Sequence, residues 1–300
     1  MISFNIQKPD TAIATALQDK INNLTKPKGS LGTLEEIALQ IGLIQQTLSP
    51  ALHHPVNVIY ASDHGIADEG VSKSPKEVTR QVIHNFLNGG AGVCFLSRQH
   101  GFEIKIVDGG VDFDFPAIPE LIDRKIRKGT RNFLYEAAMT QDEMELAIQY
   151  GADIVTDCYN KGCNVISFGE MGIGNTTTSS AVASVLLDQP VETMTGRGAG
   201  LTSEGLNRKV VAIKKAIELN RPDPADPVDV LAKVGGLDIA GMTGVFLGGA
   251  ALHMPVLMDG FISCVAALIA MKLCPTAGDY ILASHVSKEP AAHLILESIG

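Results

Sequence analysis

The segment Ser167–Ser180, which reads SFGEMGIGNTTTSS, constrains the fold of this chain more than any other part of the sequence. It begins at the end of the apolar run Cys163–Phe168, which is typical of a buried strand, and precedes Ala181–Leu187, which is typical of a helix. Unpaired N–H groups at the start of a helix point outward and, together with the helix dipole, favour a bound anion. A structural turn with one amide or hydroxyl cap is the alternative, yet the segment has six such residues in succession. The segment therefore predicts an anion-binding turn, at which Gly172 and Gly174 let a ligand approach the backbone.

Strands and helices alternate along residues 51–300. The expected strands are continuous apolar runs at 56–60, 102–107, 163–168, 255–258 and 280–283. Residues 113–139 interrupt the alternation, and we expect a long irregular connection there. Buried strands that alternate with helices predict an α/β fold, with a doubly wound, mainly parallel, Rossmann-like sheet.

Residues 1–50 follow a different pattern, because two helical segments occur there without a strand. Ile13, Leu17 and Ile21 have helical spacing, and a second helical segment follows the glycine-containing break near residue 30. We therefore expect a small helical domain at 1–50 beside the α/β domain at 51–300.

Three helix starts carry capping signals. Thr33 with Glu36, and Thr140 with Glu143, have the spacing of a capping box. The segment Ser74–Glu77 combines a hydroxyl cap, a proline at the first helical position and a glutamate three residues after the cap. Each signal predicts that a helix begins at its hydroxyl residue.

The charge and the cysteines restrict the possible partners and compartment. A formal net charge of −9 argues against nucleic-acid and anionic-membrane partners, because neither would be attracted to the protein. Five cysteines at irregular spacing do not indicate a disulfide framework, so we expect a cytoplasmic protein. Residues 1–8 lack the apolar stretch of a signal peptide. The uncharged segment Ile239–Met258 is long enough to span a bilayer, but its glycines and Pro255 favour a buried helix followed by a strand.

Polar residues follow each of the five expected strands. These strand ends are Ser62–Gly65, Asp108–Gly110, Gly169–Gly172, Asp259–Gly260 and Ser284–His285. Each could be a plain turn, since aspartate followed by glycine is common in turns. Parallel strands, however, end at the same edge of a sheet, where open α/β folds bind ligands. The five ends together therefore predict a binding cleft.

Several well-known chemical motifs are missing from the chain. We find no phosphate loop, no dinucleotide fingerprint, no His-Glu-x-x-His zinc motif and no Gly-x-Ser-x-Gly nucleophile elbow. Cys158 and Cys163 have no partners at the spacing of zinc ligands. We therefore expect no metal and no cofactor, and chemistry on a phosphorylated small molecule remains.

Several longer motifs occur in a fixed order along the chain. They are Lys26–Gly32 (KPKGSLG), Asp63–Gly65 (DHG), Glu77–Val82 (EVTRQV), Gly169–Thr176 (GEMGIGNT), Gly235–Ala240 (GGLDIA) and Val256–Ser263 (VLMDGFIS). In these motifs, and over nearly its whole length, the chain resembles the nicotinate-nucleotide–dimethylbenzimidazole phosphoribosyltransferase family. The resemblance implies an enzyme of the cobalamin pathway. Such an enzyme moves the phosphoribosyl group of nicotinate mononucleotide to 5,6-dimethylbenzimidazole, releasing nicotinate and giving α-ribazole 5′-phosphate. The resemblance also implies a homodimer of Rossmann-like subunits, each with a small helical domain built from both chain ends.

The resemblance further implies roles for particular residues. Those implied to hold the phosphate and ribose of the nucleotide are Gly172, Gly174, Asn175, Thr176 and Thr177. Lys209 would reach the phosphate, and Ser72 and Gln81 would lie near the benzimidazole. On pattern alone, these last three residues could equally lie on the solvent-exposed faces of helices.

One family feature does not occur in this sequence. The family's general base is a glutamate in an Arg-Leu-Gly-Glu-Gly segment close to the C-terminus, and this chain, which ends at Gly300, contains no such segment. We therefore expect an incomplete helical domain with exposed apolar surface. Glu170 is the carboxylate that remains in the matching motifs, and we assign it a supporting catalytic role as a hypothesis. Two alternatives stay open: a non-catalytic protein that binds nucleotides or benzimidazoles, and a different phosphoribosyl- or nucleotide-dependent enzyme on the same sheet.

Overall fold

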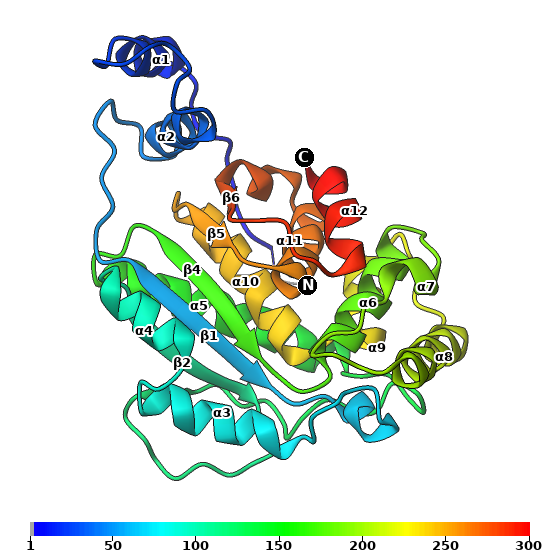
Figure 1. Cartoon of the computed structure of the whole chain (residues 1–300). Coiled ribbons are helices and arrows are strands. Elements are labelled where there is room, and N and C mark those ends of the chain that lie inside the picture. The colour runs from blue at the N-terminus through cyan, green and yellow to red at the C-terminus, as the bar shows by residue number, and fades with distance from the viewer. Residues whose placement is uncertain (1–2) are drawn as a thin grey trace.

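The centre of the molecule is a six-stranded sheet in the order β3-β2-β1-β4-β5-β6 (Figure 1). The computed structural model describes residues 3–300. The strands are β1 Val56–Ser62, β2 Glu103–Gly110, β3 Leu121–Asp123, β4 Ile166–Met171, β5 Val256–Met258 and β6 Ile281–Ala283. All neighbouring pairs are parallel, which confirms the α/β class and the doubly wound, Rossmann-like sheet.

The strand order reverses between β1 and β4. The chain passes from β1 outward to β2 and β3, then returns to β4 on the other side of β1 and continues to β5 and β6. Tyr60 of β1 is paired with Glu170 of β4, so the two strands end side by side. Open α/β sheets bind ligands at such a switch point, because the loops that leave the two strands diverge there.

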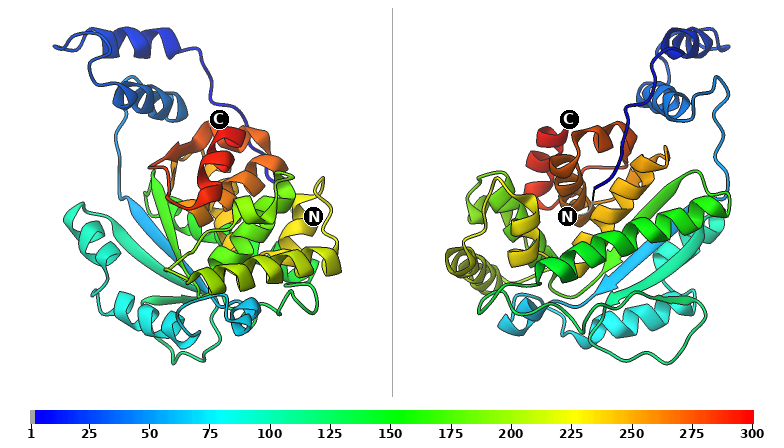
Figure 2. Two further views of the ribbon diagram at one scale, coloured as in Figure 1. Left: turned by 45° about the vertical axis from the view of Figure 1, so that its right-hand side comes forward. Right: turned by 180° about the vertical axis from the view of Figure 1, so that it is seen from behind.

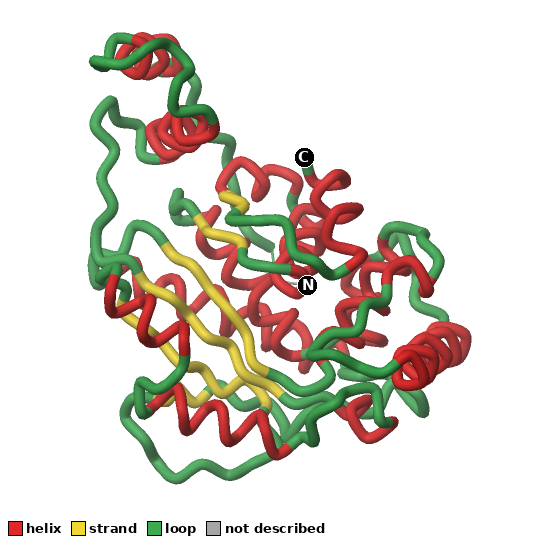
Figure 3. Tube along the Cα trace, in the orientation of Figure 1, coloured by secondary structure: helices red, strands yellow, loops and turns green. Residues whose placement is uncertain are grey.

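Helices cover both faces of the sheet, as the ribbon views in Figure 2 and the trace in Figure 3 show. Helices α3 and α4 pack on one face, while α5 and α10 pack against each other on the opposite face. The remaining helices of the α/β body lie beside the β4–β6 half of the sheet. The helices are α1 Ala14–Asn22, α2 Thr33–Ile44, α3 Glu77–Leu87, α4 Gly92–Gln99, α5 Gln141–Asn160, α6 Asn175–Leu186, α7 Val191–Met194, α8 Ser203–Asn220, α9 Pro227–Val234, α10 Leu237–Ala251, α11 Phe261–Leu273 and α12 Pro290–Ile299, with short 3-10 turns η1 Gly65–Glu69 and η2 Pro275–Tyr280.

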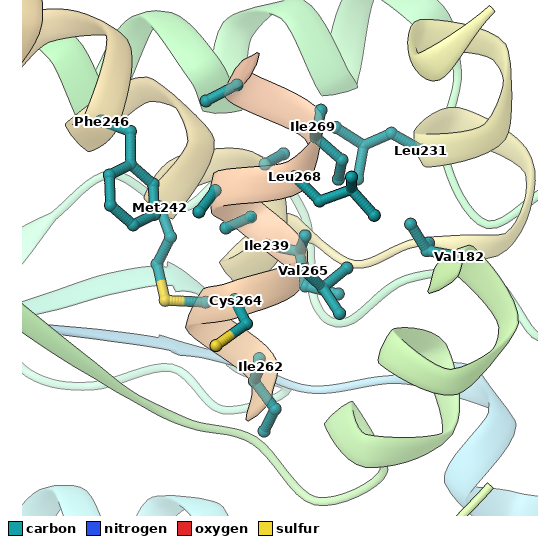
Figure 4. Close-up of a cluster of buried hydrophobic side chains, with 14 of the residues drawn as sticks. Val182, Leu231, Ile239, Met242, Phe246, Ile262, Cys264, Val265, Leu268 and Ile269 are labelled. Atoms are coloured by element: carbon teal, nitrogen blue, oxygen red, sulfur yellow. The ribbon is translucent and has the colours of Figure 1, made fainter. Parts of the chain in front are cut away.

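The core of the α/β body lies around α10, which is buried along almost its whole length. A methyl group on Gly151 of α5 would lie 1.9 Å from the carbonyl oxygen of Gly241, and one on Gly244 would lie 1.9 Å from the carbonyl oxygen of Ile148. The glycines of α10 therefore let its backbone touch α5. Apolar side chains from α6, α9, α10 and α11 fill the space on the other side, as Figure 4 shows for Val182, Leu231, Ile239, Met242, Phe246, Val265, Leu268 and Ile269.

The uncharged segment Ile239–Met258 thus contains most of the buried helix α10 and the whole of strand β5, as its glycines and proline indicate. Within residues 3–300, no helix combines the length and the apolar character that crossing a membrane requires.

Helices α1 and α2 lie apart from the sheet, at the upper left of Figure 1. Gln40 of α2 joins them to the α/β body, since its amide donates to the carbonyl oxygens of Asp279 and Ile281 at 3.1 and 3.0 Å. The pair leaves apolar side chains in solvent: Leu31 and Leu34 are 49% and 63% exposed. Apolar surface is therefore present on this part of the molecule.

Several local expectations differ from the structure. The Thr140 capping box forms as predicted, with Thr140 and Glu143 each bonded to the other's backbone N–H. The Thr33 capping box is wrong, because Gly32 occupies the cap position and has no side chain to bond the free N–H groups. Helix α3 begins at Glu77 rather than at Ser74. Residues 113–139 contain the short edge strand β3, which the sequence did not predict.

Candidate active site

The predicted anion-binding turn lies at the switch point, where β4 passes into α6. Gly174 occupies the cap position of α6 with φ +102°, a conformation that a residue with a side chain rarely adopts. Helix α6 begins at Asn175, earlier than the apolar pattern indicated, so the hydroxyl residues form its first turns. Because the first N–H groups of a helix lack intrahelical partners, Gly172–Thr177 is a candidate anion-binding turn, which we call the cradle below.

Glu170 precedes the cradle at the end of β4. Its carboxylate accepts a short hydrogen bond from the side-chain amide of Asn175. The side chain is only partly exposed and lines a small pocket. Burial raises the pKa of Glu170 to about 8, and the neighbouring carboxylates of Asp238 and Asp259 add to the increase, whereas Asn175 and His64 oppose it. Glu170 is therefore a carboxyl group that titrates near neutral pH.

Lys209 reaches the cradle from α8. Its ammonium donates to the Thr176 hydroxyl at 2.9 Å and to the Gly196 carbonyl oxygen at 3.3 Å, and the residue is fully buried. Burial lowers the pKa of Lys209 to about 8, although the Glu289 carboxylate opposes this effect. The prediction that Lys209 lies close to the cradle thus agrees with its position, while the alternative of a solvent-exposed helix lysine does not.

The Thr177 hydroxyl is also buried at the cradle. It has no hydrogen-bond partner among residues 3–300. A buried hydroxyl without a partner is costly, so this group is available to a ligand. Thr176 and Thr177 therefore place two hydroxyl groups at the start of α6.

A pocket of about 160 Å³ opens beside the cradle at the ends of β4, β5 and β6. Its lining residues are Gly169, Glu170, Thr176, Asp259, Gly260, Phe261, Ile262, Ser263, Ser287 and Glu289. A larger hollow of about 540 Å³ lies near β2 and β3, but no residue of the cradle lines it. The smaller pocket is the one that brings the sheet edge, Glu170 and Thr176 together.

The two residues implied to lie near the acceptor come from α3 and the loop before it. Ser72 is half-buried in the loop before α3, where its hydroxyl accepts from the Ser74 N–H at 3.3 Å. Gln81 is exposed on α3. No hydrogen bond in the described part of the chain joins either side chain to the cradle. A hydrogen bond between α3 and the cradle is made by Thr79.

Thr79 is a site residue that the sequence reasoning did not single out. It is fully buried on α3, and its hydroxyl accepts from the Ile173 N–H of the cradle at 3.1 Å. Its presence in the motif Glu77–Val82 is the only signal in the sequence, because a threonine near the start of an amphipathic helix is otherwise ordinary.

His64 and Asp238 form a second feature of the switch point. Both side chains are fully buried, and His64 Nε2 lies 3.2 Å from an Asp238 carboxylate oxygen. The fold thus brings together two residues that lie 174 positions apart along the chain.

The other strand ends are not all part of one site. Asp108 is paired with Lys125 at 3.0 Å, away from the cradle. Ser284 donates to the Met258 carbonyl oxygen, and the neighbouring His285 is exposed. Within residues 3–300, no group of three or more His, Cys, Asp or Glu side chains has a geometry that could hold a metal ion.

Comparisons with known proteins match the chain over its full length. A family model described as a phosphoribosyltransferase (DBI_PRT) matches residues 6–300. A nicotinate-nucleotide–dimethylbenzimidazole phosphoribosyltransferase from Parabacteroides distasonis is 62% identical over 301 residues, which cover 100% of this chain and 87% of that protein. The protein of the same name from Bacteroides fragilis is 52% identical over 300 residues, with the same coverage. A crystal structure of CobT from Thermus thermophilus superposes with a TM-score of 0.92 at 37% identity, covering 96% of this chain and 86% of that one.

Proposed function

The chain belongs to the nicotinate-nucleotide–dimethylbenzimidazole phosphoribosyltransferase family, and on that premise we propose that its switch-point site carries out the transfer. The enzyme moves the phosphoribosyl group of nicotinate mononucleotide to 5,6-dimethylbenzimidazole, a step of cobalamin biosynthesis, and nicotinate is released. The observation that carries the assignment to this site is the buried Lys209 ammonium, which lies 2.9 Å from the hydroxyl of Thr176, a residue that lines the same pocket as Glu170.

The chemistry explains what each of these groups contributes. The pyridinium nitrogen of nicotinate mononucleotide is already positively charged, so the leaving group departs without a proton from the protein. The phosphate needs an anchor that fixes the ribose for attack, because positioning lowers the barrier of a two-substrate reaction. In our proposal the N–H groups of Gly174 and Thr176 and the Lys209 ammonium hold that phosphate, with the Thr176 and Thr177 hydroxyls beside it.

Glu170 takes part in removing the proton from the attacking benzimidazole. As one ring nitrogen forms the new bond to the ribose, the other must lose its hydrogen. With a pKa of about 8, about one-tenth of the Glu170 carboxyl groups are ionised at pH 7, and those that are ionised are strong bases for a carboxylate. We expect the rate to rise with pH through this range.

Ser72 and Gln81 bind the benzimidazole in this proposal. Two observations support the role: Ser72 lies in the loop that leads to α3, and Thr79 bonds α3 to Ile173 of the cradle. A base bound beside α3 would thus approach the cradle from the side opposite Lys209. Attack from the face opposite nicotinate gives the α-anomer, α-ribazole 5′-phosphate.

The test follows nicotinate release by chromatography when the protein is mixed with nicotinate mononucleotide and 5,6-dimethylbenzimidazole. We expect release that requires both compounds, and a Glu170→Gln variant that is at least about tenfold slower. The exposed Glu120 provides a matched control, since Glu120→Gln should leave the rate unchanged. Release that does not depend on the benzimidazole, or no release, would contradict the proposal.

We also propose a homodimer, a cytoplasmic location and a domain boundary near residue 50. Exposed leucines on the α1–α2 pair support the dimer, because apolar surface of this kind is commonly covered by a partner. Five free cysteines support the location. The extended connection between α2 and β1 supports the boundary. Analytical ultracentrifugation, cell fractionation and limited proteolysis test these three proposals.

A further inference from the structure

The His64 side chain packs against the backbone of the cradle, and Asp238 lies beside the His64 ring. A methyl group on Gly172 would lie 2.9 Å from His64 Nε2, and one on Gly174 would lie 3.2 Å from His64 Cβ. On the other side of the ring, a methyl group on Gly236 would lie 2.5 Å from His64 Cε1 and 2.5 Å from an Asp238 carboxylate oxygen. The imidazole is therefore packed between the cradle and the start of α10, and three glycines make the space that it occupies.

The same pair lies next to the charge of Glu170. The groups that affect this carboxyl come from separate elements: Asp238 at the start of α10, Asp259 after β5, His64 after β1 and Asn175 at the start of α6. Glu289 lines the same pocket, and Lys209 lies beyond Thr176. His64 is the cationic group among those that act on Glu170 most directly, and it stands 3.2 Å from the strongest anionic one.

His64 has three carboxylates around it. Burial lowers the pKa of His64, but Asp238, Asp63 and Glu170 together outweigh burial, so the net pKa is raised. The geometry gives the ring an anionic partner at Nε2, because an Asp238 carboxylate buried without a cation would be strongly unfavourable, whereas His64 Nδ1 has no hydrogen-bond partner among residues 3–300.

We propose that His64 and Asp238 are positioning residues for the transfer: the His64 ring supports the Gly172–Gly174 backbone, and its charge shields Glu170 from the negative charge of Asp238. The proposal rests on the role of Glu170 in the proposed function. Neither residue is assigned a contact with substrate. Their effect on catalysis passes through the cradle and through the protonation of Glu170.

The central test is the pH dependence of nicotinate release in His64→Gln. This variant leaves the Asp238 carboxylate unshielded beside Glu170, so the rising limb of the rate profile should move to higher pH by about one unit. The rate should therefore fall about tenfold at about pH 7 and recover much of the loss above about pH 9. A purely structural role would reduce the rate by the same factor at every pH.

The double variant His64→Gln, Asp238→Asn separates charge from packing. Removing the unshielded carboxylate should return the rising limb of the rate–pH profile to within about 0.3 pH units of the wild-type position. The maximal rate should stay low, because the His64 ring is still missing. Asp108→Asn is the matched control: it removes another buried carboxylate at the same sheet edge, and the limb should not move. An unmoved limb in His64→Gln, or no return in the double variant, overturns the proposal.

A second measurement does not depend on whether His64→Gln folds. In wild-type protein labelled with ¹⁵N-histidine, one ring should keep the nitrogen shifts of a charged imidazolium to a higher pH than an ordinary histidine, and Asp238→Asn should abolish that signal. Absence of such a ring in the wild type overturns the proposal. The wild-type reaction distinguishes failure of this proposal from failure of the proposed function. If the wild type does not release nicotinate, the proposed function is contradicted instead.

Discussion

The protonation of Glu170 should be visible in the stability of the protein as well as in its activity. Its pKa of about 8 in the folded protein stands against 4.5 for an ordinary glutamate. A carboxyl group whose pKa is raised by folding stabilises the folded state fully below about pH 4.5, and this contribution is lost as the pH rises through about 8. The perturbation that reveals it is Glu170→Gln, since glutamine has a similar shape and does not titrate.

The magnitude follows from linkage between protonation and folding. Between about pH 6 and about pH 9, the wild-type free energy of unfolding should fall by about 2–3 kcal/mol because of this carboxyl group alone. The Glu170 side chain is only partly buried and lines a pocket, so we expect the lower value, about 2 kcal/mol. The glutamine variant lacks this contribution. The difference in stability, variant minus wild type, should therefore grow by about 2 kcal/mol over the same range.

Urea unfolding followed by far-ultraviolet circular dichroism is the suitable assay, because the chain contains no tryptophan for fluorescence. Comparing variant and wild type at the same pH cancels the titration of the groups that do not interact with Glu170. Glu120→Gln removes an exposed carboxyl group and should show the same difference at both pH values. A Glu170→Gln difference that is equal at both pH values would refute the raised pKa, and with it the protonation step assigned to Glu170.

Three further predictions concern the cradle and its supports. Lys209→Met should lower kcat/KM for nicotinate mononucleotide about 100-fold, with little change in the KM for dimethylbenzimidazole, because one charged phosphate contact is lost; steady-state kinetics checks this. Gly174→Ala should destabilise the protein by about 1–2 kcal/mol in urea unfolding, since φ is +102° there, whereas Gly92→Ala, where a methyl group meets nothing within 4 Å, should not. Thr140→Ala should cost about 1 kcal/mol of stability through the lost capping box and leave nicotinate release unchanged.

The parts of the fold that could be predicted are those that local pattern determines. Continuous apolar runs mark buried parallel strands wherever both faces of the sheet are covered, which holds for the inner strands here. The edge strand β3 has three residues, none fully buried, so its composition does not differ from that of a loop. The predicted capping box of α2 was wrong because local spacing does not decide which residue takes the cap position. Thr33 has the right spacing, but the chain places Gly32 at the cap and bonds Glu35 to Lys26 instead.

The site likewise contains residues that a local pattern predicts and residues that only long-range contacts define. The cradle is one continuous segment, so its glycines and hydroxyl groups can be recognised in the sequence. Lys209 lies on a helix whose pattern favours a solvent-exposed lysine, and only the packing of α8 against α6 buries it against Thr176. Thr79 is likewise defined by a contact with Ile173, 94 positions away along the chain.

The charge of Glu170 shows why these long-range contacts matter most. A glutamate in a strand–glycine–helix turn would ordinarily be ionised at neutral pH, and nothing in its own motif predicts otherwise. Its neighbours Asp238 and Asp259 belong to motifs that follow much later in the chain, and His64 belongs to one that precedes it by about a hundred residues. They meet because the strand order reverses between β1 and β4, which directs the loop after each strand toward the start of α10. Each of the four motifs could be an ordinary turn. Because the sheet brings them together, their charged residues determine the pKa of Glu170 beside the cradle.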